Sequence, residues 1–202
     1  MRDGWRTFWV LAMGAYALSA PAETLLNDGG THVVSDNTYA TDPLRLEDSP
    51  AGLTTTLTIR DPAIVAGDPF AAVGTIAVSA EATHGGHAVL QMQGGTVVGL
   101  DARGGSLLDI TGGRLQAPMY GIPVLRAGDT AGPVIVGIAG GQFDGGIDLG
   151  DNVTLTMSGG TIGQLPAWQS IRAASSVGAT SLTVSGGSSP DGWNWAPTPT
   201  PS

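Results

Sequence analysis

A short pattern recurs five times in this chain: two apolar residues at alternate positions, one further residue and then a pair of glycines. The five copies are Leu90–Gly95, Leu108–Gly113, Val136–Gly141, Leu155–Gly160 and Leu182–Gly187. Their glycine pairs begin 18, 28, 19 and 27 residues apart. An internal repeat of this kind indicates one supersecondary unit stacked on copies of itself. These steps fit one coil of a β-solenoid whose loops vary in length.

The glycine pair is expected to turn the chain sharply after each strand. Glycine reaches positive φ without a steric penalty and, lacking a Cβ, allows the backbones of successive coils to approach closely. In the first four copies an apolar residue follows the pair by two positions and would begin the next side of the coil. These residues are Val97, Leu115, Phe143 and Ile162. The fifth copy continues with serines instead, which is typical of a terminal capping repeat.

Other alternating stretches predict further strands, because alternation over short runs is typical of half-buried strands. These stretches are Leu57–Ile59, Ile76–Val78, Val98–Leu100, Ile122–Val124 and Ile147–Leu149. Residues 167–174 are the best candidate for a short helix or a loop. We therefore predict an all-β fold, a right-handed parallel β-helix over residues 53–188 with glycine-rich corners. The alternative is an antiparallel β-sandwich, which also uses short alternating strands but needs no repeat in a fixed frame.

The two ends of the chain differ from the repeats. Residues 1–22 combine Arg2 and Arg6, an apolar run over 8–18, and small residues at Ala20 and Ala22, which is the pattern of a cleaved secretory signal peptide. Residues 23–52 are expected to form an N-terminal cap or an irregular first coil. Residues 189–202 form a Pro-rich tail, in which Trp193 and Trp195 would cover the end of the stack or form an exposed aromatic patch.

Composition excludes several classes of function. The formal net charge is −9, and the basic residues are all arginine, so we expect no nucleic-acid partner, since an acidic surface repels a phosphate backbone. The chain contains no cysteine, which excludes disulfides and thiolate metal sites. No apolar stretch after the signal peptide is long enough to span a membrane. We expect an exported protein that is secreted, periplasmic or attached to the cell surface.

The elements LTMSGGTIG (155–163), LDITGGRL (108–115) and LTVSGG (182–187) resemble the repeats of autotransporter passenger domains, which have a pectin-lyase-like right-handed β-helix. The resemblance covers roughly residues 53–188 and implies adhesion or surface display, with extracellular glycans or proteins as partners. An autotransporter ends in a membrane β-barrel of amphipathic strands, and we expect no such barrel within residues 1–202. We therefore expect a truncated gene product, a passenger-only protein or an exported protein outside that system.

Two groups of side chains have the composition of a metal site. His84 and His87 flank two glycines, with Glu81 as the nearest carboxylate, and zinc requires three or four such ligands. We interpret this segment as a solvated turn. The segment 142–152 contains four oxygen-bearing side chains that calcium accepts, although it lacks the glycine spacing of the calcium-binding nonapeptide repeat, and we interpret them as corner residues. They are Asp144, Asp148, Asp151 and Asn152.

Enzymes built on β-helices place carboxylates, often with an arginine, on one exposed face. Asp101 with Arg103, and Asp109 with Arg114, are the candidates for such a face, although Asp101 and Arg103 would also pair simply as surface residues. A concave groove lined by two or more carboxylates and an arginine would favour an enzyme. The sequence assigns no catalytic, cofactor-binding or metal-binding residue. It favours a structural or adhesive protein, with a polysaccharide lyase or glycoside hydrolase as the alternative.

Overall fold

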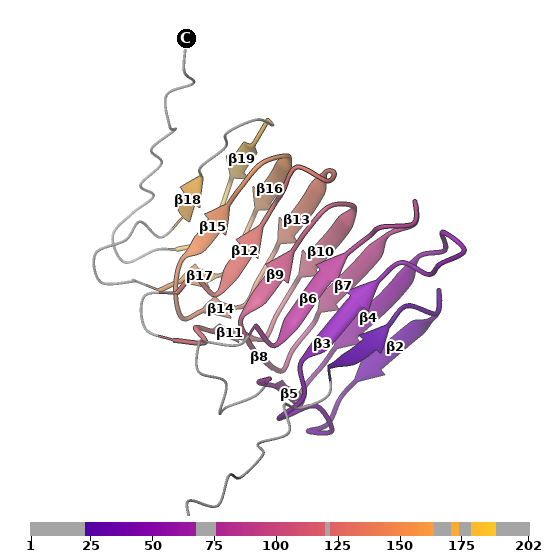
Figure 1. Cartoon of the computed structure of the whole chain (residues 1–202). Helices are drawn as coiled ribbons and strands as arrows, with labels where there is room; N and C mark the ends of the chain where they lie inside the picture. Colours follow the sequence, from indigo (N-terminus) through magenta and orange to yellow (C-terminus); the bar gives the residue numbers. More distant parts are fainter. Residues whose placement is uncertain (1–22, 68–75, 120–121, 164–170, 174–178, 189–202) are drawn as a thin grey trace, which may run out of the picture.

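The computed structural model describes residues 23–67, 76–119, 122–163, 171–173 and 179–188. Within these ranges the chain forms strands and no helix, and therefore no helix long and apolar enough to cross a membrane. Every strand pairing is parallel, and the strands form three sheets that we name A, B and C. The chain visits the sheets in the order A, B, C in each of the five inner coils of the described stack, and the coils stack along one axis from the N-terminal to the C-terminal end (Figure 1). The fold is the predicted right-handed parallel β-helix.

Sheets A and B each contain one strand from every coil of the described stack. Sheet A consists of β1 (Thr24–Leu26), β3 (Leu44–Glu47), β6 (Val78–Glu81), β9 (Leu100–Ala102), β12 (Leu125–Ala127), β15 (Ile147–Leu149) and β18 (Ile171–Ala173). Sheet B consists of β2 (Thr31–Val34), β4 (Thr55–Ile59), β7 (Ala88–Met92), β10 (Ser106–Ile110), β13 (Val134–Ile138), β16 (Val153–Met157) and β19 (Ser181–Val184). Sheet C is shorter and consists of β5 (Ile64–Val65), β8 (Thr96–Val98), β11 (Arg114–Gln116), β14 (Gln142–Phe143) and β17 (Thr161–Ile162).

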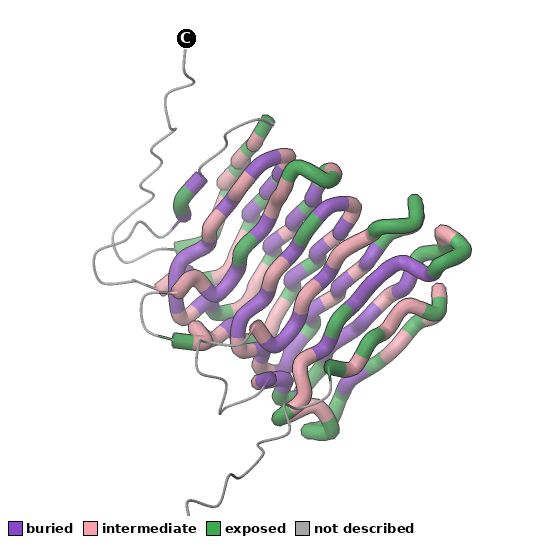
Figure 2. The backbone as a smooth tube through the Cα atoms, viewed as in Figure 1, coloured by how far each residue is buried: buried purple, intermediate pink, exposed green. Residues whose placement is uncertain are grey.

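The core is a set of apolar columns that run along the stack. The five repeat copies lie in one register on sheet B, where each leading apolar residue pairs with the corresponding residue of the next coil. That column contains Leu57, Leu90, Leu108, Val136, Leu155 and Leu182. Buried and exposed positions alternate along the strands (Figure 2). A fully buried leucine contributes about 1.5–3 kcal/mol, so these columns supply the main stabilisation of a chain without disulfides.

The two glycines of each pair have different roles at the corner between sheets B and C. In the last four pairs the first glycine packs against a backbone carbonyl of the preceding coil: a Cβ on Gly112 would lie 2.6 Å from the Gln93 carbonyl oxygen. In the first pair, a Cβ on Gly94 would instead lie 2.8 Å from the backbone nitrogen of Asp61. The second glycine of each pair has a positive φ, as at Gly113 with φ 83°. The first glycines of the later pairs meet the carbonyl oxygens of Thr111, Ala139 and Ser158 in the same way. Both glycines are therefore required, one by close approach and the other by backbone conformation.

The apolar residues that follow the glycine pairs lie on the next side of the coil, as predicted, each as the second residue of a sheet C strand. Val97, Leu115, Phe143 and Ile162 are all fully buried. At the fifth copy, Ser188 makes an isolated parallel bridge to Thr161 in place of a sheet C strand.

Several local predictions were wrong. Val98–Leu100 is a corner rather than a strand, because Gly99 turns the chain between β8 and β9 with a φ of 78°. The strand expected at Ile122–Val124 begins three residues later, at Leu125. Residues 171–173 of the expected helix or loop form strand β18, since Ile171 and Ala173 fill the apolar column of sheet A. Of Ile76–Val78, only Val78 belongs to a strand.

The N-terminal segment 23–52 continues the stack. Its strands β1 and β3 pair in sheet A, and β2 pairs with β4 in sheet B. The first coil contributes no strand to sheet C, because the described residues 35–43 lead from β2 directly to β3. The expected signal peptide at 1–22 and the tail at 189–202, with Trp193 and Trp195, lie outside the described residues.

Candidate functional site

The outer face of sheet A carries one column of charged side chains. Strands β3, β9, β12, β15 and β18 of this sheet have an apolar–charged–apolar centre, so the flanking residues enter the core and the middle one faces outward. In register, Asp101 on β9 neighbours Arg126 on β12, which neighbours Asp148 on β15, which neighbours Arg172 on β18. Strands in a sheet are about 4.8 Å apart. The face therefore presents alternating negative and positive charges at the spacing of the coils.

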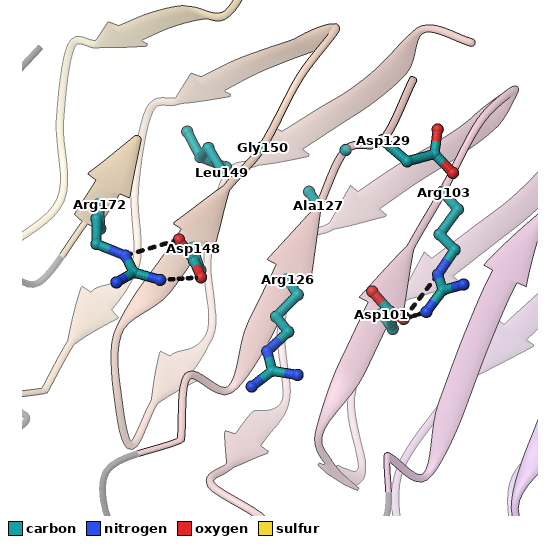
Figure 3. Close-up of a pocket in the computed structure, with 10 residues that line it drawn as sticks. Asp101, Arg103, Arg126, Ala127, Asp129, Asp148, Leu149, Gly150 and Arg172 are labelled. Atoms are coloured by element: carbon teal, nitrogen blue, oxygen red, sulfur yellow. Dashed lines mark hydrogen bonds and ion pairs between the residues drawn. The ribbon is translucent and has the colours of Figure 1, made fainter. Parts of the chain in front are cut away.

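Two ion pairs hold the aspartates of this column (Figure 3). Asp148 accepts two hydrogen bonds from Arg172, from Nε to Oδ1 at 3.0 Å and from Nη2 to Oδ2 at 2.5 Å. Arg103 follows β9 and donates to a single oxygen of Asp101, with Nε and Nη2 at 3.0 and 2.9 Å from Oδ2. The electrostatic attraction of Asp101 raises the pKa of Arg103, and the hydrogen bond to Asp148 raises the pKa of Arg172.

Arg126 lies between the two ion pairs, and its guanidinium is directed away from both carboxylates (Figure 3). Among the residues that the structure describes, Arg126 has no hydrogen-bonding or ion-pair partner. The other five arginines in those ranges each contact a carboxylate or an amide oxygen. These contacts are Arg45 with Glu47, Arg60 with Gln93, Arg103 with Asp101, Arg114 with Asp144 and Arg172 with Asp148.

The residues of the charged column line a shallow depression of about 380 Å³. Three aspartates and three arginines line it, together with small or apolar residues. The charged residues are Asp101, Asp129, Asp148, Arg103, Arg126 and Arg172; the others are Ala127, Gly128, Leu149 and Gly150. Asp129 uses its Oδ1 to accept a hydrogen bond from the backbone N–H of Ala131, within its own turn. The depression thus meets the composition expected of a β-helix enzyme groove, but its aspartates are engaged by arginines or by their own turn.

The histidine pair is part of a corner. His84 Nδ1 lies 2.9 Å from Thr83 Oγ1 and 3.3 Å from Asp48 Oδ1, while His87 Nδ1 lies 3.1 Å from the Gly105 carbonyl oxygen. Within the described ranges no three histidine or acidic side chains converge as metal ligands. The interpretation as a turn therefore agrees with the contacts of both rings.

Asp48 holds this corner and was not predicted from the sequence. Its side chain is fully buried, and it accepts hydrogen bonds from the backbone N–H groups of Thr83, His84 and Gly86 at 2.7–2.8 Å. Burial by itself would raise the pKa of Asp48, but these three N–H groups and the His84 ring outweigh it, so the pKa is lowered. A buried carboxylate with this many donors stays ionised and fixes the loop.

The four oxygen-bearing residues at 144–152 are not brought together. Asp144 accepts hydrogen bonds from Arg114 and Gln142 beside sheet C. Asp148 belongs to a strand of sheet A rather than to a corner. Asp151 is buried in the turn after β15, and Asn152 occupies the left-handed region with a φ of 57°, a conformation that asparagine tolerates better than most residues. The corner interpretation therefore fits the last two residues but not Asp148.

Of the two predicted acidic–basic pairs, one forms. Asp101 and Arg103 make the ion pair described above. Asp109 faces outward on sheet B, whereas Arg114 lies on sheet C and contacts Asp144, because the glycine corner at 112–113 separates them. The sequence interpretation missed Arg126 and Arg172. The recurring triplets LRL, LDA, LRA, IDL and IRA, centred on residues 45, 101, 126, 148 and 172, were the signal that could have found them.

Comparison of the chain with protein-family models, curated proteins and solved structures gave no match.

Proposed function

We propose that this protein is an exported structural or adhesive protein, similar in role to an autotransporter passenger, that presents the outer faces of its β-helix to extracellular glycans or proteins. The observation that supports this most directly is the charged column of sheet A. Asp101, Arg126, Asp148 and Arg172 stand in register, one per coil, around a shallow depression. A rigid, repeating surface of this kind offers hydrogen-bond donors and acceptors at regular intervals along an extended ligand.

Export and binding are tested separately. The full chain is expressed in a bacterial host, and the N-terminal sequence of any exported product is determined; we expect it to begin at Glu23. The purified product is then screened against arrays of glycans and extracellular proteins. Saturable binding without loss of the ligand supports the proposal. Retention of the uncleaved chain in the cytoplasm would contradict export, and no binding to any array member would contradict the adhesive role.

The composition of the depression favours one alternative, a carbohydrate-active enzyme on the same scaffold. Asp101 and Asp148 are two strands apart, which corresponds to about 9.6 Å between their backbones, and inverting glycosidases separate their two carboxylates by about 6.5–9.5 Å. Both carboxylates are, however, held by arginines, and these hydrogen bonds would have to be given up before either carboxylate could exchange a proton with a sugar. Release of shortened or unsaturated sugars from any polymer in the screen would establish the alternative.

A further inference from the structure

We propose that the depression on sheet A binds an acidic sugar residue, with Arg126 holding the single carboxylate of that sugar. This proposal deepens the proposed function and rests on it. The proposal is based on a difference between Arg126 and its neighbours in the charged column of sheet A. Arg126 has an aspartate beside it on each neighbouring strand, yet each aspartate is engaged by a different arginine.

The unused N–H donors of Arg126 indicate which kind of anionic group the depression would bind. A guanidinium has five N–H donors in a planar fork that matches a carboxylate in a bidentate arrangement. None of these donors is used within the described part of the chain, and the guanidinium lies away from both ion pairs (Figure 3). The two ion pairs occupy Asp101 and Asp148, so a ligand carboxylate would not have to displace either of them to reach Arg126.

Unused acceptors elsewhere in the lining of the depression define the remainder of the ligand. Both hydrogen bonds from Arg103 go to Oδ2 of Asp101, and Asp129 uses only Oδ1 in its turn. In the described ranges this leaves Oδ1 of Asp101 and Oδ2 of Asp129 to accept hydrogen bonds from hydroxyl groups. The lining residues Ala127, Gly128 and Gly150 are small and leave room above the sheet. A ligand with one carboxylate and several hydroxyls, an acidic sugar, satisfies both sets of groups.

The charge balance favours a ligand with few negative charges. The three aspartates and three arginines of the depression sum to zero, while the whole chain has a formal net charge of −9. A densely charged polyanion would be repelled by the surrounding molecule. A single carboxylate at Arg126 experiences mainly the local guanidinium, because charges beyond about 8–10 Å are screened at physiological ionic strength.

The test is a titration of the full chain, followed by NMR or calorimetry, with D-glucuronate and N-acetylneuraminate as probes. D-Glucose and acetate are the reference ligands, since one lacks the carboxylate and the other lacks the hydroxyls. We expect saturable binding of at least one acidic sugar, at least about tenfold tighter than either reference ligand. Arg126→Gln should weaken that binding about tenfold or more, which corresponds to about 1.4 kcal/mol.

Arg114→Gln is the matched control, because Arg114 is also an exposed arginine but is engaged by Asp144 beside sheet C. It should bind the acidic sugar as the unaltered chain does. The unfolding transition of Arg126→Gln should match that of the unaltered chain, because Arg126 is exposed and makes no hydrogen bond or ion pair with the residues that the structure describes. A shifted transition would show that it has a structural role instead. Equal affinity of Arg126→Gln and the unaltered chain, or equal affinity for glucose or acetate, would overturn the proposal.

These outcomes are separable from those of the proposed function. Binding of other glycans or proteins in the array screen, unaffected by Arg126→Gln, would leave the adhesive role standing and remove the acidic-sugar site. Binding that depends on Arg126 but is followed by cleavage of a polymer containing the sugar would retain the site and replace the adhesive role by a catalytic one.

Discussion

The glycine corner and the outer face of sheet A belong to the same coils but are under opposite constraints. At the corner between sheets B and C, backbone meets backbone, and a first glycine such as Gly140 has no space for a side chain. On the outer face of sheet A, the side chains point outward and are exposed or half-buried, and the register allows arginine, aspartate or serine at the same position of successive coils. The corner thus determines the stacking, whereas the face is free to acquire a function.

The largest expected effect comes from adding one methyl group at the corner. A Cβ on Gly140 would lie closer than 3.0 Å to the carbonyl oxygen of Thr111, which is backbone of the preceding coil and cannot rotate away. We expect Gly140→Ala to reduce the free energy of unfolding by about 3 kcal/mol, measured by urea denaturation. Gly137→Ala is the matched control on strand β13, because the nearest atom to its Cβ would be 3.7 Å away.

Gly137→Ala should change the free energy of unfolding by less than about 1 kcal/mol, with stabilisation as the favoured direction, since alanine restricts the unfolded chain. If Gly140→Ala and Gly137→Ala unfold at the same urea concentration, the close approach of backbones does not require glycine at the corner.

A smaller loss in the free energy of unfolding is expected at the corner between sheets A and B. There the loop is held by a side chain, Asp48, rather than by close packing of glycines. Asp48 accepts three backbone N–H groups from the loop 83–86 of the following coil. Asp48→Ala would leave these donors without a partner, and we expect a loss of about 2 kcal/mol in the free energy of unfolding. Hydrogen exchange should show faster exchange at Thr83, His84 and Gly86. Unchanged exchange there would mean that the loop is held by other contacts.

The same carboxylate predicts a dependence of stability on pH. The folded-state pKa of Asp48 lies below its ordinary value of 3.8, so its contribution is complete above that value. It decreases as the pH falls through the lower, folded-state pKa. The unfolding free energy should therefore decrease on acidification below about pH 4, with a smaller decrease in Asp48→Asn, which cannot titrate. Parallel decreases in both chains would assign the acid sensitivity to other carboxylates.

The features that were predicted from the sequence are local. Alternation and glycine pairs act within six residues, and they identified the strands of sheet B from β4 onward and buried residues of sheet C, such as Phe143. The charged column was missed because it is formed only by register. Asp101, Arg126, Asp148 and Arg172 are 25, 22 and 24 residues apart, and the variable loops between them hide the period.

Two groups of residues that the sequence analysis placed together, Asp109 with Arg114 and the acidic cluster at 144–152, are separated in the structure for the same reason. Asp109 and Arg114 are close in sequence but lie on different sheets, because a glycine corner separates them. Asp148 is near Asp151 and Asn152 in the sequence, yet it faces outward on a strand while they form the following turn. Proximity along a solenoid chain predicts proximity in space only within one side of a coil; beyond it, the residue one coil away is the closer neighbour.

The smallest effect should come from the face itself. Arg103 makes an exposed ion pair with Asp101, and such pairs contribute about 0–1 kcal/mol because solvent and salt screen them. We expect Arg103→Gln to change the free energy of unfolding by less than about 1 kcal/mol, measured by urea denaturation beside Gly140→Ala. The change should shrink further at high salt. A loss comparable to that of Gly140→Ala would mean that the charged column stabilises the stack, and the division between a structural corner and a permissive face would no longer hold.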